Sequence, residues 1–105
     1  MNILIIGSGG RESAFAYKLS KSPRLDQLFI APGNAGTEAY GQNVNIKVTD
    51  FESSASVVLE NAVQRVLVGP EEPLVKGIHD YFWNREDLKN IRVIGPHQEG
   101  AQLEG

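Results

Sequence analysis

The sequence predicts an α/β fold in which a parallel sheet carries helices on both faces. Short runs of branched apolar residues alternate along the chain with longer stretches of helical periodicity. The first run, residues 3–6, is apolar at every position, which is typical of a strand buried on both faces. Four runs end in glycine-bearing loops, and the carboxyl ends of parallel strands share one edge of a sheet, where ligands bind. These loops begin at Gly7, Pro32, Gly69 and Gly95.

The first half of the chain predicts three strands and one helix. The strand at 3–6 leads into a helix from about Arg11 to residue 22, which Pro23 ends. A second strand is expected at 25–31, where a Pro-Gly pair stops it. Residues 44–48 alternate apolar and polar side chains, which predicts a half-exposed strand at or near a sheet edge.

The second half repeats the alternation. Residues 51–63 carry an amphipathic helical stripe, with Asp50 or Thr49 as the expected N-cap. In the next helix, we expect Trp83 to be a partly buried packing residue and His79 to be solvated. The remaining expected elements are a strand at 65–69, one helix from 74 to about 86, a strand at 91–94 and the start of a helix at 97–105.

Composition excludes several classes of function. A chain of 105 residues is long enough for one domain with a core. Its net charge of −3 offers no basic surface, which argues against nucleic acid and anionic membranes as partners. The absence of cysteine removes disulfides, thiolate catalysis and cysteine-based zinc sites. Because His79 and His97 lack ligand spacing, we expect no metal site in this chain.

The sequence also predicts a cytoplasmic protein. No apolar run approaches the roughly 20 residues that span a bilayer. Met1 leads directly into the first strand, which leaves no room for a signal segment.

The loop at 7–11 follows the first strand and opens the first helix. Glycines let the backbone approach a ligand closely, and the first helical N–H groups and the helix dipole favour an anion. The sequence therefore favours a phosphate-bearing ligand here, with a glycine turn that only packs helix against strand as the alternative. The dinucleotide fingerprint is incomplete, because Glu12 stands at its third glycine position and no carboxylate follows the second strand. The P-loop pattern is absent.

Two later loops are expected at the same edge. The segment 32–37 contains Gly33 and Asn34, which tolerate unusual φ and expose backbone amides, although an ordinary surface turn explains this segment alone. The segment 69–74 places Glu71 where a carboxylate stabilises a helix N-terminus. The same carboxylate would face the crevice, where it would accept hydrogen bonds from sugar hydroxyls or an amine. Both interpretations of Glu71 stay open.

Five segments carry a resemblance that spans the whole chain. They are Ile-Gly-Ser-Gly-Gly-Arg-Glu at 6–12, Ala-Pro-Gly-Asn-Ala-Gly-Thr at 31–37, Val-Gly-Pro-Glu-Glu-Pro-Leu-Val-Lys-Gly at 68–77, Ile-Gly-Pro at 94–96 and Ala-Gln-Leu-Glu-Gly at 101–105. In these segments the chain resembles the N-terminal domain of the phosphoribosylamine-glycine ligase family, also called glycinamide ribonucleotide synthetases. One position departs from the family pattern Gly-Gly-Arg-Glu-His-Ala, because Ser13 replaces the histidine.

The resemblance implies an ATP-grasp ligase of de novo purine biosynthesis. In such an enzyme ATP phosphorylates the carboxylate of glycine, and the amine of 5-phosphoribosylamine attacks the acyl phosphate. The products are glycinamide ribonucleotide, ADP and phosphate. The resemblance further implies a Rossmann-like or flavodoxin-like preATP-grasp domain that helps to hold the phosphoribosyl substrate. ATP and Mg²⁺ (or Mn²⁺) would bind mainly on a later ATP-grasp domain, outside this chain.

From this resemblance we expect residues 1–96 to form the preATP-grasp domain and 97–105 to begin a linker toward an ATP-grasp domain. The expected partners are phosphoribosylamine, glycine and the remaining domains of the same polypeptide, with no nucleic acid and no membrane. We expect no catalytic residue in this chain. The chain alone should therefore not catalyse the ligase reaction. Two alternatives remain: a free-standing Rossmann-like nucleotide-binding module, and the same domain of another ATP-grasp carboxylate-amine ligase.

The candidate substrate-binding residues come from the three loops. In this hypothesis the backbone amides of the first loop take a ribosyl 5-phosphate, and Glu12 or Glu71 meets hydroxyls or the amine. The candidates are Gly9, Gly10, Arg11, Glu12, Gly33, Asn34, Gly69, Pro70 and Glu71.

Overall fold

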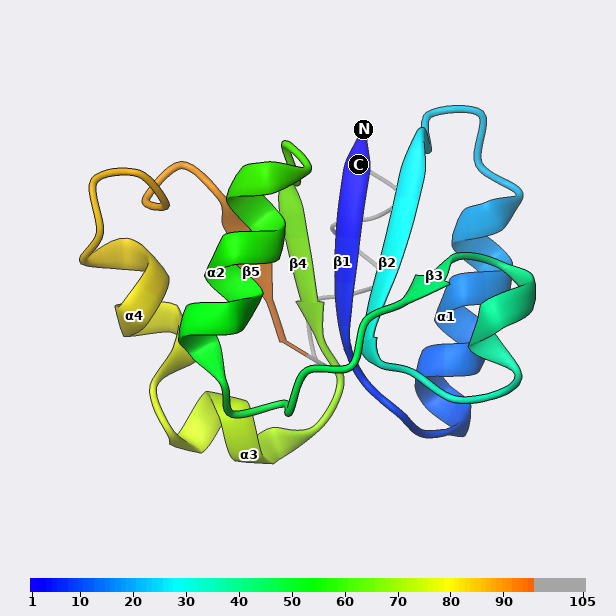
Figure 1. The fold of residues 1–105 in the computed structure, drawn as a ribbon, viewed down its shortest axis with the longest axis horizontal. Helices are drawn as coiled ribbons and strands as arrows, with labels where there is room; N and C mark the ends of the chain where they lie inside the picture. Colours follow the sequence, from blue (N-terminus) through cyan, green and yellow to red (C-terminus); the bar gives the residue numbers. More distant parts are fainter. Residues whose placement is uncertain (96–105) are drawn as a thin grey trace.

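The structure is a computed structural model, and it describes residues 1–95 (Figure 1). Five strands form one sheet in the order β3-β2-β1-β4-β5, and all neighbouring pairs are parallel. The strands are β1 Asn2–Gly7, β2 Gln27–Pro32, β3 Gln42–Asn43, β4 Arg65–Val68 and β5 Arg92–Ile94. The helices are α1 Gly10–Ser20, the 3-10 helix η1 Thr37–Ala39, α2 Phe51–Glu60, α3 Glu71–Val75 and α4 Ile78–Trp83. The predicted α/β fold with a parallel sheet is confirmed.

The chain starts in the middle of the sheet, at β1 (Figure 1). It then builds outward through β2 to β3, returns through α2, and continues on the other side of β1 with β4 and β5. The direction of building therefore reverses between β1 and β4, as in Rossmann-like sheets, which bind ligands at this point of reversal.

The core lies on both faces of the sheet, as the apolar run of β1 predicted. Leu4 and Ile6 belong to a cluster that includes buried residues of α2 and α4. Ile3 and Ile5 belong to a second cluster that includes buried residues of α1. All four side chains are at most 2% exposed, so β1 is buried on both sides.

The predicted strand at 44–48 was wrong. The strand at this edge is β3, and it pairs with β2 through Gln42 and Asn43 only. Val44, Ile46 and Val48 are partly buried against the α2 cluster, without forming a strand. Their alternation therefore reflects half-burial of a segment that leaves the sheet after the Val44 N–H donates to the carbonyl oxygen of Ile30 at 2.7 Å. The segment then turns, since the Ile46 N–H donates to the carbonyl oxygen of Val44 at 2.8 Å.

The single helix predicted from 74 to about 86 was also wrong. The structure has two short helices here, α3 and α4, separated at Gly77, whose φ is +95°. A left-handed residue cannot continue an α-helix, and glycine adopts this conformation without steric cost. The chain therefore turns at Gly77 before Ile78 enters the core.

The prediction that Trp83 is partly buried was wrong as well. Trp83 is 71% exposed, whereas the preceding Phe82 is 1% exposed. Ile78 and Phe82, four positions apart, share the buried face of α4, and the next position points away from that face. His79 is exposed as predicted, and its Nε2 lies 3.0 Å from the carbonyl oxygen of Val93.

The other boundaries shift by a few residues. α1 ends at Ser20 rather than at 22, α2 ends at Glu60 rather than at 63, and β4 and β5 are each one residue shorter than predicted. β2 begins at Gln27 rather than at 25 and includes Pro32. The helix expected to start at His97 and the proposed linker at 97–105 lie outside the described residues.

Asp50 caps α2, which confirms one of the two predicted caps. Its Oδ1 accepts a hydrogen bond from the Ser53 N–H at 3.1 Å, and its Oδ2 accepts one from Ser53 Oγ at 2.7 Å. The side-chain bond first, and the backbone bond second, lower the pKa of Asp50 from its ordinary value. A lowered folded-state pKa stabilises the fold above the unfolded-state pKa, and this contribution is lost as the pH falls through the folded-state pKa.

We therefore expect Asp50→Asn, which keeps a good capping residue but cannot titrate, to reduce the acid sensitivity of the fold. Melting temperatures measured from about pH 7 down to about pH 3 should fall less steeply for this variant than for the wild type. Glu52→Gln, which neutralises an exposed carboxylate in the same first turn without removing the cap, should change the pH dependence less than Asp50→Asn does. Parallel curves for Asp50→Asn and the wild type would contradict the prediction.

Candidate functional site

Three of the predicted loops meet at the carboxyl edge of the sheet, at the lower end of the sheet in Figure 1. The Gly33 N–H donates to the carbonyl oxygen of Gly7 at 3.0 Å, which joins the loops after β2 and β1. The Gly69 N–H donates to the carbonyl oxygen of Ile6 at 3.0 Å, which holds the start of the β4 loop against β1. The edge expected from parallel strands is therefore present, with the β1 loop between the other two.

The β1 loop turns directly into α1. Gly9 is the N-cap, and Gly10 is the first helical residue. The N–H groups of the first turn have no intrahelical acceptor and carry the positive end of the helix dipole. One of the neighbouring groups is already used, because the Gly9 N–H donates to Glu12 Oε1 at 3.3 Å. The N–H groups of Gly10 and Arg11 are therefore the better candidates for an anion.

Arg11 and Glu12 both reach toward the β4 loop from the first turn of α1. Arg11 is exposed, and its Nη1 donates to the carbonyl oxygen of Gly69 at 3.4 Å. Glu12 is only 7% exposed, so its carboxylate lies beneath the surface of the site rather than on it. The first turn of α1 thus places an exposed guanidinium and a buried carboxyl group next to the β4 loop.

Asn34 links the β2 loop to the β1 loop. Its Nδ2 donates to the carbonyl oxygen of Ser8 at 2.9 Å and to Ser13 Oγ at 3.0 Å. Its Oδ1 accepts from the N–H groups of Gly36 at 2.7 Å and Thr37 at 3.0 Å. Because both ends of the amide are engaged within the protein, the side chain of Asn34 holds the loops together.

Two residues of this link were not singled out from the sequence for a role in the site. Ser13 stands where the resemblance expects histidine, and its hydroxyl pairs with Asn34. Thr37 is fully buried, and its Oγ1 accepts from the Asn34 N–H at 2.8 Å and donates to Asn43 Oδ1 at 2.6 Å. The Asn-x-x-Thr spacing at 34–37 could have identified Thr37 from the sequence, since Asn and Thr side chains form hydrogen bonds to nearby backbone in turns.

The β4 loop contributes an exposed acidic corner. Pro70 is the extended N-cap of α3, and Glu71 and Glu72 occupy its first turn. Both glutamates are exposed. The position of Glu71 fits both interpretations from the sequence, because it lies in a helical first turn and also follows a strand that ends at this edge.

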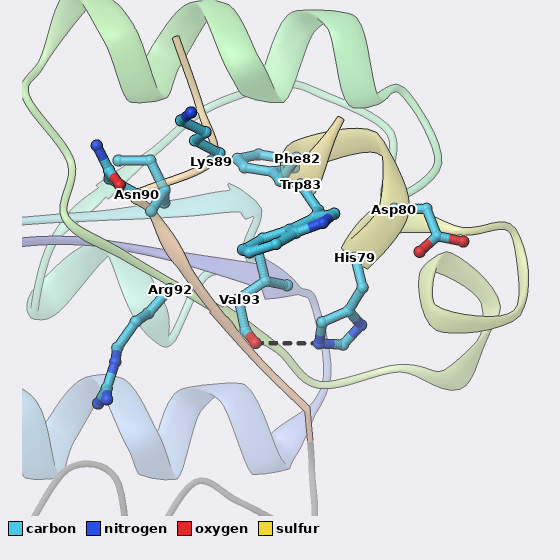
Figure 2. Close-up of a pocket in the computed structure, with 9 residues that line it drawn as sticks. His79, Asp80, Phe82, Trp83, Lys89, Asn90, Arg92 and Val93 are labelled. Carbon is cyan, nitrogen blue, oxygen red and sulfur yellow. Dashed lines mark hydrogen bonds between the residues drawn. The ribbon is translucent and has the colours of Figure 1, made fainter. Parts of the chain in front are cut away.

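A groove of about 380 Å³ lies elsewhere, beside α4 and β5 (Figure 2). Trp83, Lys89 and Arg92 are among its lining residues, and Figure 2 shows the hydrogen bond between His79 and Val93 in it. None of its lining residues belongs to the three loops. This groove is therefore separate from the candidate site at the loop edge.

Within residues 1–95, no group of three or more histidine, cysteine, aspartate or glutamate side chains is placed to hold a metal ion. Over the same residues, no helix has the length and apolar character needed to cross a membrane.

Comparisons with known proteins agree with the resemblance seen in the sequence. The family model described as phosphoribosylglycinamide synthetase, N domain, matches residues 1–104. Proteins named phosphoribosylamine–glycine ligase from Vibrio cholerae, Haemophilus influenzae and Pseudomonas aeruginosa are 46%, 48% and 50% identical to the chain over 107 aligned positions. Each alignment covers 100% of this chain and 24% of the relative, so the chain spans about a quarter of the length of these relatives. The chain belongs to the family of the phosphoribosylglycinamide synthetase N domain.

Proposed function

We propose that this chain forms the part of a phosphoribosylamine-glycine ligase that holds the phosphoribosyl substrate. The proposed enzyme joins glycine to 5-phosphoribosylamine with ATP, giving glycinamide ribonucleotide, ADP and phosphate in purine biosynthesis. The observation that carries the proposal is the meeting of three loops beside the N-terminus of α1, in a chain of this family. Such an edge offers N–H groups to a phosphate without needing a reactive side chain.

Each loop has a separate role in the proposed site. The N–H groups of Gly10 and Arg11 bind the 5-phosphate, and the exposed Arg11 side chain adds a positive charge. Glu71 accepts hydrogen bonds from sugar hydroxyls or the amine. Gly33, Gly69 and Pro70 shape the walls through their backbone.

Catalysis is assigned to other parts of the proposed enzyme. ATP and Mg²⁺ (or Mn²⁺) would bind mainly outside this chain, on an ATP-grasp domain. We propose a cytoplasmic location for the enzyme, and the remaining domains of its polypeptide as partners.

Amide NMR of the ¹⁵N-labelled chain tests the substrate site. Ribose 5-phosphate and glycinamide ribonucleotide are expected to shift the signals of Gly9, Gly10, Arg11 and Glu71, weakly, because the chain is expected to form only part of the pocket. NADH, which also carries phosphate and ribose, is the control and should produce smaller shifts. Shifts confined to the α4–β5 groove, or equal shifts with NADH, would contradict the assignment.

A second experiment tests the reaction itself. The protein as its gene encodes it should form glycinamide ribonucleotide only when glycine, phosphoribosylamine and ATP are all present. Activity with a different carboxylate and amine would favour another ATP-grasp ligase. Nucleotide binding without any ligase activity would favour a free-standing binding module.

A further inference from the structure

The buried carboxylate of Glu12 is an unusual feature for a site that is proposed to bind a phosphate. The side chain is 7% exposed, and it lies in the first turn of α1, where the N–H groups of the proposed phosphate site begin. An accessible carboxylate there would repel a phosphate. Because the side chain is buried, Glu12 contacts the loops from the protein interior rather than from the side that faces the ligand.

Two glycines leave room for this carboxylate. A Cβ atom at Gly7 would lie 2.2 Å from Glu12 Oε1, and a Cβ atom at Gly69 would lie 2.6 Å from Glu12 Cδ. Real Cβ atoms do not approach other atoms this closely, so any side chain at either position would have to displace Glu12. The Glu12 carboxylate therefore fills the space between the end of β1 and the loop after β4.

The same carboxylate also fixes the backbone of the β1 loop. Glu12 Oε1 accepts the Gly9 N–H at 3.3 Å, which turns this N–H toward the interior. The neighbouring Arg11 holds the β4 loop from its outer side, through the carbonyl oxygen of Gly69. The first turn of α1 thus contacts both loops that flank the point of reversal in the sheet.

We infer that Glu12 is a positioning residue: wedged between Gly7 and Gly69 and bonded to the Gly9 N–H, it sets the spacing of the β1 and β4 loops for a sugar phosphate. This inference rests on the proposed function and revises the earlier hypothesis that Glu12 itself meets the substrate. Its role depends on the shape and the acceptor oxygen of the side chain rather than on its charge.

Substitutions that separate shape from charge test the inference. Glu12→Gln keeps both the volume and an acceptor oxygen, whereas Glu12→Ala removes both. In the protein as its gene encodes it, the Kd for ribose 5-phosphate, measured by calorimetry, should stay within about threefold for Glu12→Gln. It should rise about tenfold or more for Glu12→Ala, since small displacements of binding groups are costly.

Glu52 provides the matched control, because it is an exposed glutamate in the first turn of α2. Glu52→Gln and Glu52→Ala should leave the Kd unchanged. If Glu12→Gln weakened binding as much as Glu12→Ala, the carboxylate charge would be acting on the ligand and the inference would be wrong. Unchanged binding in Glu12→Ala would also overturn it.

A double-mutant cycle at positions 12 and 69 tests the wedge without any ligand. Gly69→Ala should lower the melting temperature of the wild type, because its methyl group displaces Glu12. In the Glu12→Ala background the methyl group enters vacated space, so the same substitution should cost much less. If the losses of melting temperature from Glu12→Ala and Gly69→Ala were additive, Glu12 would not fill the space beside Gly69, and the inference would be wrong. If the wild type bound no ribose 5-phosphate, the proposed function would fail, and the cycle would still decide whether Glu12 sets the loop spacing.

Discussion

Replacing Phe82 by alanine is expected to lower the free energy of unfolding by about 3–5 kcal/mol. Phe82 is 1% exposed and is among the largest fully buried side chains of residues 1–95. It belongs to the same cluster as Ile78, Leu88 and the buried residues of α2. α4 has six residues, and a helix this short depends on packing rather than on its own stability. The loss should therefore combine a cavity with loosening of α4.

The adjacent Trp83 supplies a matched control of even larger volume. Because Trp83 is 71% exposed, Trp83→Ala is expected to change the free energy of unfolding by no more than about 0.5 kcal/mol. Urea denaturation followed by circular dichroism measures both variants. Comparable losses for the two variants would show that Trp83 stabilises α4 as much as Phe82 does, and would contradict the prediction.

The contrast between these neighbours shows where sequence patterns predict burial and where they do not. Residues 3–6 of β1 are all apolar, so both faces had to be buried, and the prediction did not depend on the register of the strand. In α4 the aromatic residues 81–83 are consecutive, so the buried face depends on where the helix begins. The break at Gly77 sets that start, and periodicity assumed over 74–86 did not reveal it.

The arrangement of the candidate site was likewise predictable only in part. Parallel strands place the loops that follow them at one edge, so the meeting of the β1, β2 and β4 loops followed from the order of the elements alone. The roles of individual side chains did not follow. Ser13 and Asn34 are far apart in sequence, and their hydrogen bond exists because β1 and β2 are neighbours. The burial of Glu12 depends likewise on the position of the β4 loop.

Replacing Gly7 by alanine is expected to lower the free energy of unfolding by about 2–4 kcal/mol, through two separate causes. The φ of Gly7 is +146°, which side-chain-bearing residues rarely adopt. Its added Cβ would also lie 2.2 Å from Glu12 Oε1. Gly7 ends the central strand and accepts the Gly33 N–H, so a shift there would disturb two loops. Urea denaturation measures the loss.

Gly10 is the control for this substitution, because a Cβ there meets nothing within 4 Å. Gly10→Ala lies at the start of α1 and should leave the free energy of unfolding unchanged or raise it by up to about 1 kcal/mol.

Combining Glu12→Ala with each of the variants Gly7→Ala and Gly69→Ala separates the two causes, which are the backbone conformation and the clash with Glu12. Gly69 has no positive φ, so removing the Glu12 side chain should relieve most of the cost of Gly69→Ala. The same removal should relieve Gly7→Ala only in part, because the backbone strain remains. Equal relief at both positions would show that the clash with Glu12, and not the backbone conformation, requires glycine at the end of β1.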